Sequence, residues 1–228
     1  ASELGVDYFV EGTIRGTDTI RVSASLVRAA DLSQLWSDTV DREIKDLLPF
    51  QSALAEQVAR GVDVAVVASA RTAPLVARSS EAYLEYLRGR TLWSQRDEAS
   101  LKGALQAFEK SVALQNDFAP AWVGIADTYY VLTDHGHLSA RDGWLRAKAA
   151  ADRALALDPQ LAEAWTSAAM YRALYEWNAS CALEAFERAL ALNPNNSTAH
   201  HWFALVLSAH GDREGAVGAL EKAASLDP

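Results

Sequence analysis

Histidines are the residues whose type and spacing first suggest chemistry in this chain. His135 and His137 flank a single glycine, and His200 and His201 are adjacent. A zinc site needs three or four donors that converge on the ion at about 2 Å. A His-x-His pair in a predicted loop and a His-His pair on a predicted helix do not direct their nitrogen atoms to one point. We therefore predict no metal site and no cofactor.

The sequence also lacks the usual residues of a nucleophilic or phosphate-binding centre. Cys181, the single cysteine, falls near the start of a predicted helix, where the pKa of a thiol can be lowered, but no histidine or acid is placed to pair with it. An inert thiol is the favoured interpretation. No G-x-S-x-G, Walker or G-x-G-x-x-G motif is present, and the acidic residues are scattered. We expect no catalytic residues and no enzyme activity.

Composition excludes two classes of partner. The 228 residues include 21 Lys and Arg against 30 Asp and Glu, which gives a net charge of −9. No basic run is present, which argues against direct binding to nucleic acid. The longest apolar run, Val62–Ala70, is shorter than the roughly 18 residues of a membrane span and contains Asp63. We expect no membrane span in this sequence.

The first part of the chain shows the alternation of β-strands. Ile20–Arg28 places apolar residues at every second position, and Tyr8–Arg15 and Gln34–Arg42 are similar. Turn-forming residues at Gly16–Thr19 and Ala29–Ser33 separate the three segments. The pattern predicts an antiparallel meander with one buried face.

A helix is expected to cover that face. Apolar residues recur at steps of three and four from Leu47 to Val62, and Pro49 lies in the first turn, where its missing N–H costs little. A small sheet cannot bury its apolar face alone. We predict an α/β domain over residues 1–68, incomplete at its start, and a linker over residues 69–79. Both ends of the sequence have the character of cuts through a longer polypeptide.

From residue 80 onward the sequence repeats itself. Leu114, Leu157, Leu192 and Leu226 recur at intervals of 43, 35 and 34 residues, and each is followed two residues later by Asn or Pro, which favour a helix end. Seven residues after the first three of these leucines comes an alanine and then a large ring: Ala121-Trp122, Ala164-Trp165 and Ala199-His200. His200 takes the place of a tryptophan, so we interpret it as a packing residue. Each repeat is predicted to be a pair of antiparallel helices, over residues 80–117, 118–160, 161–195 and 196–228.

These helix pairs resemble the tetratricopeptide repeat (TPR). The segment Trp122–Tyr129 is close to the family motif W-x2-L-G-x2-Y, and Ala182, Phe186, Ala189 and Pro194 match its second-helix motif. The first repeat departs more from the pattern. The resemblance implies a superhelix of about four helix pairs, so the fold class is α+β: a small antiparallel sheet with a covering helix, followed by an all-α TPR array.

The N-terminal part is similar to the TolB-like (FlgO-like) α/β segment. The similarity is carried by G-V-D-Y-x-x-E-G at Gly5–Gly12, by Leu35–Ser37 and by Phe50-Gln51. In bacteria this segment often precedes TPR repeats in winged-helix regulators, class III adenylate cyclases and Ser/Thr kinases, none of which is contained in this chain. The resemblance implies a non-catalytic interaction and regulatory module of such a protein, located in the cytoplasm. Alternatives are a periplasmic domain of a membrane-anchored regulator, a cell-envelope assembly or chaperone-like factor, and an enzyme with an unrecognised site.

The TPR resemblance also implies a concave groove lined by the first helix of each repeat. Family positions 5, 9, 12 and 13 transfer to three repeats. They are Val123, Asp127, Tyr130 and Val131, then Thr166, Met170, Ala173 and Leu174, and finally His201, Leu205, Ser208 and Ala209. This mostly apolar set favours a peptide or protein ligand. The alternative is that the protein's own neighbouring helix or its α/β part fills the groove.

Overall fold

The computed structural model describes residues 8–16, 19–43 and 78–227. The chain divides into two units, Ala1–Ala73 and Pro74–Pro228, which are treated separately below. The covering helix predicted over residues 47–62 lies outside the described residues, as do positions 17 and 18 of the first predicted turn.

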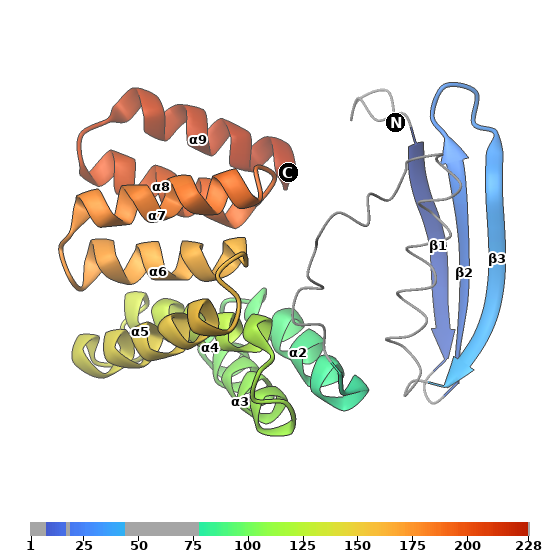
Figure 1. Cartoon of the computed structure of the whole chain (residues 1–228), viewed down its shortest axis with the longest axis horizontal. Helices are drawn as coiled ribbons and strands as arrows, with labels where there is room; N and C mark the ends of the chain where they lie inside the picture. Colours follow the sequence, from blue (N-terminus) through green and yellow to red (C-terminus); the bar gives the residue numbers. More distant parts are fainter. Residues whose placement is uncertain (1–7, 17–18, 44–77, 228) are drawn as a thin grey trace. The chain divides into compact units, whose positions relative to one another are not determined.

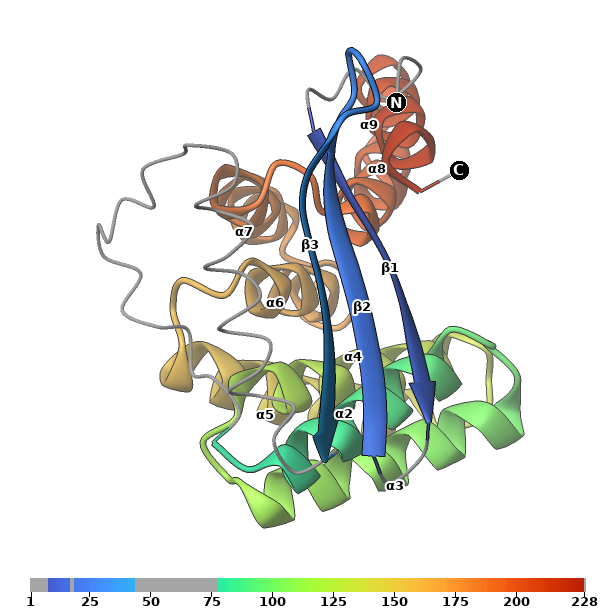
Figure 2. The same ribbon diagram turned by 90° about the vertical axis from the view of Figure 1, so that its right-hand side faces the viewer.

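The first unit contains a three-stranded antiparallel sheet in the order β1-β2-β3. Its strands are β1 (Tyr8–Gly16), β2 (Thr19–Arg28) and β3 (Gln34–Glu43), with β2 in the middle (Figure 2). The predicted meander is therefore confirmed. The β2–β3 pairing shifts register between Leu26 and Val27. Val27 is buried although the alternation places it on the face of Ser23 and Ser25.

The two faces of the sheet differ as the alternation predicts. Val22, Ala24 and Leu26 of β2 are buried, whereas Ser23 and Ser25 on the other face are partly exposed. On that polar face Arg21 forms a two-pronged ion pair with Asp41 of β3, at 2.7 and 2.8 Å. Both side chains are more than half exposed, so this pair fixes strand register more than it adds stability.

The second unit consists of helix pairs that stack in chain order (Figure 1). Its described residues form eight helices, four pairs as the repeat spacing predicts. The pairs are α2 (Ser80–Trp93) with α3 (Glu98–Leu114), α4 (Ala119–Asp134) with α5 (Ala140–Leu157), α6 (Ala162–Leu174) with α7 (Ala179–Leu192), and α8 (Ser197–Ala209) with α9 (Arg213–Leu226). Among the described residues no helix is both long and apolar enough to cross a lipid bilayer.

The second helix of every pair begins with a side-chain cap. The capping residues are Asp97, Ser139, Asn178 and Asp212, and each accepts a hydrogen bond from the backbone N–H three residues later. The same helices also end alike, because the residue after each one is extended and its N–H still bonds back into the helix. Identical ends in four pairs are the local basis of the repeat.

Packing between the pairs relies on small residues facing rings. Phe108 of α3 is fully buried, and a Cβ atom on Gly89 of α2 or on Gly124 of α4 would lie only 2.5 Å from its ring. The two glycines therefore let both first helices approach the same ring. In the third repeat, Phe186 of α7 takes the place of Phe108, and its ring centroid lies 5.3 Å from that of Phe203 of α8.

In the second, third and fourth repeats, the ring near the start of the first helix has one shared role. The indole nitrogens of Trp122 and Trp165 donate to the backbone carbonyls of Asn116 and Pro159, six residues earlier. The Nε2 atom of His200 lies 2.9 Å from the carbonyl of Pro194, also six residues earlier. His200 therefore replaces the tryptophan in fixing the entry into its helix.

Candidate functional site

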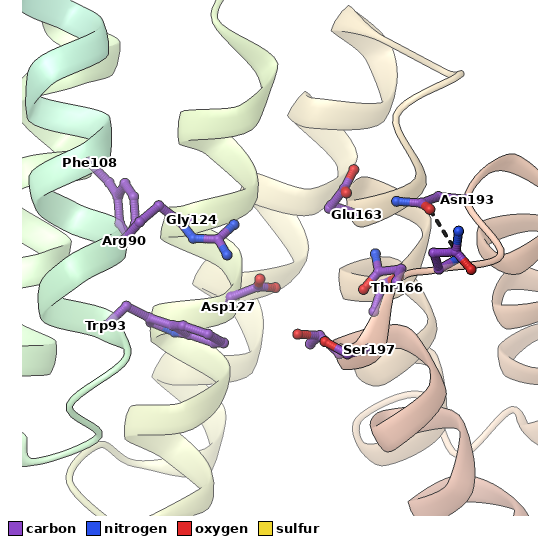
Figure 3. A pocket seen from close by; sticks show the side chains of 12 residues that line it. Arg90, Trp93, Phe108, Gly124, Asp127, Glu163, Thr166, Asn193 and Ser197 are labelled. Atoms are coloured by element: carbon purple, nitrogen blue, oxygen red, sulfur yellow. Dashed lines mark hydrogen bonds between the residues drawn. The ribbon is translucent and has the colours of Figure 1, made fainter. Parts of the chain in front are cut away.

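A cavity of about 230 Å³ opens on the side of the array formed by the first helices (Figure 3). All four first helices, Phe108 of α3 and the turn that leads into α8 contribute to its wall. The lining residues are Arg90, Trp93, Phe108, Gly124, Asp127, Glu163, Thr166, Asn193, Asn195, Asn196, Ser197 and Thr198. Every one of the four repeats thus supplies part of one recess.

The α2 side of the cavity is built around Trp93. The guanidinium of Arg96 stacks on its ring at 3.5 Å and that of Arg90 lies 5.9 Å from it. The Trp93 side chain is only 8% exposed, and its Nε1–H has no hydrogen-bond partner among the described residues. Arg96 adopts a left-handed backbone (φ 63°), which is costly for a residue other than glycine. The stack places two cations at this edge.

Asp127 of α4 carries the strongest electrostatic perturbation in the cavity. Burial raises the pKa of its carboxyl to about 7 from an ordinary value of 3.8, and the charge of Glu163 adds to the rise. A hydrogen bond of 2.5 Å from the Ser167 hydroxyl, together with the charges of Arg90 and Arg96, opposes the increase. Figure 3 shows Arg90 reaching from α2 towards this carboxylate, with Glu163 and Ser197 on the opposite side.

The far wall is the turn between α7 and α8. The carbonyl oxygen of the Asn196 side chain caps α8 by accepting from the Ala199 N–H at 3.0 Å, and that of Asn193 accepts from the Asn195 N–H at 3.2 Å. Because each amide uses its oxygen in this way, its NH2 group remains a donor. Ser197 and Thr198, in the first turn of α8, add hydroxyl groups.

Of the predicted groove residues, Asp127 and Thr166 line this cavity. Val123 instead packs with Ala154 and Ala164 in the core between helices. Tyr130 and Met170 are buried in a closed hollow that also includes Trp202, and Val131 is buried as well. These four side chains are therefore not exposed to a partner in this structure.

The remaining predicted groove residues do not line the cavity; Ala173 is partly buried, and Ser208 and Ala209 are exposed. Leu174 is 37% exposed, Leu205 is 45% exposed, and His201 is also on the surface. Contact between these residues and a partner stays a prediction. At Tyr130 the groove is filled by a neighbouring helix of the protein itself, as in the alternative given above, because Trp202 of α8 packs against the Tyr130 ring.

The other sequence candidates lie apart from the cavity. His135 and His137 contact each other edge-to-face, and the Nδ1 of His137 is 3.4 Å from a Glu98 oxygen. Cys181 is partly buried and its thiol is free; its backbone N–H donates to the side-chain oxygen of Asn178. No group of three or more metal-ligating side chains occurs in the part of the chain that the structure describes.

Sequence reasoning missed several of the cavity's residues, notably Arg90, Trp93, Glu163 and Asn193. The first repeat departs from the family pattern, so no groove positions were transferred to α2. The asparagines lie in a turn between repeats, outside the transferred positions. A visible signal was the run Asn193-Pro194-Asn195-Asn196, which is richer in amides than the matching turns.

A second hollow of about 460 Å³ lies between α3 and α5, over α4. It is larger and more apolar than the cavity at Asp127. The guanidinium of Arg146 donates to the hydroxyl of Tyr129 and lies 5.6 Å from the centroid of its ring. Its lining residues are Glu109, Val112, Trp122, Ile125, Tyr129, Arg146, Ala149, Ala150 and Arg153.

Comparison with known proteins supports the fold. No protein-family model and no curated protein matches this chain. Among solved structures, the thermophilic TPR protein TTC0263 of Thermus thermophilus aligns over 81% of this chain and 90% of its own, with a TM-score of 0.55 and 16% identity. MamA is also similar, over 64% of this chain and 78% of its own, with a TM-score of 0.43 and 20% identity. So is the first TPR of Spaghetti (RPAP3) bound to an HSP90 peptide, over 57% of this chain and 94% of its own, with a TM-score of 0.44 and 20% identity. The similarity to TTC0263 shows that the helical part of this chain has the TPR fold.

Proposed function

We propose that the helical part is a non-catalytic protein–protein interaction module that holds an extended polypeptide segment in the cavity. The observation that carries the proposal is that all four repeats contribute hydrogen-bonding side chains to the wall of one cavity. A peptide backbone presents donors and acceptors at regular intervals, and the cavity offers both, in the amides of the α7–α8 turn and the carboxylates of α4 and α6.

The size of the cavity also favours a polypeptide. Pockets for small organic ligands usually measure about 300–1,000 Å³ and are mostly apolar. This recess is smaller, at about 230 Å³, and many of its side chains are polar. It therefore suits one side chain of a longer segment whose backbone continues along the array.

We propose the setting from sequence resemblance alone. The TolB-like segment followed by TPR repeats suggests a regulatory or sensor module of a bacterial multidomain signalling or transcription-regulatory protein in the cytoplasm. In this role the module would bind its partner, and an output domain elsewhere would carry any chemistry.

Selection from a random peptide library tests the proposed function. A library of dodecapeptides is selected on the full chain, and bound sequences are measured by fluorescence anisotropy on the parent, Ser197→Trp and Ser180→Trp. Ser197 lines the cavity in the first turn of α8, whereas Ser180 is exposed in the first turn of α7 and does not line it. We expect Ser197→Trp to weaken binding about tenfold or more, and Ser180→Trp to leave it within about twofold. Peptides that bind Ser197→Trp as tightly as the parent would contradict the proposal.

A further inference from the structure

One stripe of α9 is largely apolar and exposed. Its four positions recur at steps of three and four residues beside the face that packs on α8, and they are Arg213, Val217, Leu220 and Ala224. Val217 is 55% exposed and Leu220 is 45% exposed. By the helical period, Glu214 and Glu221 border the stripe on the side away from α8. A repeat face that stays in water is normally polar, so this stripe indicates a surface that another helix covers.

The earlier repeats show what covers this position. The repeat position of Leu220 is completely buried in the other three second helices, where it is occupied by Phe108 of α3, Ala151 of α5 and Phe186 of α7. In two of them the cover is seen directly. Phe108 is approached by α4 at Gly124, and Phe186 lies against Phe203 of α8. The first helix of the following pair therefore packs on this stripe, and α9 presents the same stripe uncovered.

The neighbouring helix α8 is open at the matching positions. Leu205 is 45% exposed, whereas Met170, which holds this repeat position in α6, is 2% exposed. His201 is also exposed, whereas Thr166 at the matching position of α6 is buried. Side chains of both α8 and α9 therefore belong to one uncovered stacking surface. It shares no residue with the lining of the cavity at Asp127, so it is separate from the proposed peptide site.

We propose that a second copy of this chain covers the stacking surface, with the α9 helices of the two copies packed antiparallel about a twofold axis near Leu220. Successive helices of the array run in opposite directions (Figure 1), so a helix that packs on α9 in the same way runs opposite to it. A twofold axis across α9 gives the α9 helix of the second copy this direction. Twofold dimers are also the commonest form of self-association.

The residues of the stripe complement one another in this arrangement. Arg213 lies as far before Leu220 as Asp227 lies after it, so an antiparallel pair places the base of each copy opposite the acid of the other. Both side chains are exposed, and neither forms an ion pair within 4 Å with another residue that the structure describes. Val217 falls opposite the small Ala224, so the two stripes can approach closely on both sides of the axis.

Sedimentation velocity of the full chain tests the proposal. We expect the parent to change from monomer to dimer between about 1 and 100 µM. Leu220→Glu, which places a charge at the centre of the contact, should raise the dissociation constant of the dimer at least about tenfold. Leu145 of α5 is a matched control because it is 46% exposed and lies outside the corresponding stripe. Leu145→Glu should leave the dissociation constant within about twofold of the parent value.

A charge exchange tests the twofold arrangement itself. Arg213→Asp and Asp227→Arg each place like charges opposite one another and should raise the dissociation constant about threefold or more, whereas the double variant should restore it to within about twofold. Both substitutions suit the dipole of α9, so weaker association would not reflect loss of the helix.

Three results would overturn the proposal. The first is a parent that remains monomeric over the whole concentration range, and the second is Leu220→Glu associating as well as the parent. The third is a charge exchange that fails to restore association, or oligomers that grow beyond the dimer with concentration, because both indicate a head-to-tail contact or another occupant of the surface.

Discussion

The ring of Tyr130 in α4 meets the ring of Trp202 in α8 edge-on, with centroids 4.8 Å apart. The two helices belong to the second and fourth repeats, so this contact bridges the whole third repeat. Trp144 of α5 lies on another side of the same tyrosine at 5.6 Å. The three rings close the inner side of the array at this level and confine the open cavity to the level of Asp127.

Removal of the Trp202 ring should destabilise the array. Trp202 is buried, and truncation of a buried tryptophan costs about 3–5 kcal/mol. We therefore expect Trp202→Ala to lower the urea midpoint measured by far-UV circular dichroism. The neighbouring His201 is exposed, so His201→Ala should change the free energy of unfolding by less than about 0.5 kcal/mol. Equal effects of the two substitutions would show that the ring contact does not hold the array.

Gly89 and Gly124 should not tolerate even one methyl group. A Cβ on either would lie 2.5 Å from the buried Phe108 ring, so the ring or a helix must move. We expect Gly89→Ala and Gly124→Ala each to lower the free energy of unfolding, measured by urea denaturation, by about 1–3 kcal/mol. This loss should occur although alanine has the better helix propensity. Gly218 in α9 is a matched control because no atom lies within 4 Å of its added Cβ. Gly218→Ala should be stabilising by up to about 1 kcal/mol, and a loss of stability there would contradict the packing explanation.

Two turns between paired helices contain a residue with a left-handed backbone at the same position, a tryptophan in one repeat and a glycine in the other. Trp177 and Gly211 each precede a capping residue and have φ angles of 52° and 85°. Trp177 is 85% exposed, so its side chain gains little in the folded state. We expect Trp177→Gly to stabilise by about 0.5–1 kcal/mol and Gly211→Ala to destabilise by about 1 kcal/mol.

Chemical denaturation of both turn variants provides the measurement. A clear loss of stability in Trp177→Gly would mean that the tryptophan makes contacts that offset its backbone strain. Such contacts would have to arise with a second molecule or with another part of the chain.

Asp127 should make the fold less stable as pH rises. Its folded-state pKa of about 7 lies above the ordinary value of 3.8, so the folded protein holds this proton more tightly than the unfolded chain does. Its contribution to the free energy of unfolding is complete below about pH 4 and is lost as pH rises through 7. The shift corresponds to at most about 4 kcal/mol, and to less where water in the cavity solvates the carboxylate.

The parent and Asp127→Asn should therefore diverge between about pH 4 and pH 7. We expect urea unfolding to show Asp127→Asn gaining stability relative to the parent as pH rises through this interval. A difference that stays constant with pH would show that the carboxyl titrates normally.

The sequence was sufficient to predict the sheet and the helix pairs because their signals are local. Alternation in β2 and the recurring leucines with the Asn or Pro that follows each depend on a few neighbouring positions. The sequence also indicated that His200 takes the place of a tryptophan, but the bond of that ring to the carbonyl six residues earlier is seen only in the structure.

The site was less predictable because it depends on how far each repeat turns against the next. Transferred positions placed Tyr130 and Met170 on an open wall, whereas Trp202 from the fourth repeat covers them. Arg96, which stacks on Trp93, comes from a first repeat whose motif is irregular, and Asp127 becomes unusual only through burial. Periodicity within a repeat does not encode such long-range contacts.

The central claim is that the cavity between the first helices receives a polypeptide segment. Titration of the isotopically labelled chain with a library-selected peptide, followed by NMR of backbone amides, tests it most directly. The account predicts shifts concentrated at Asp127, Thr166 and Thr198, which line the cavity. Shifts concentrated at Val112, Ala149 and Arg153, in the hollow between α3 and α5, would contradict it.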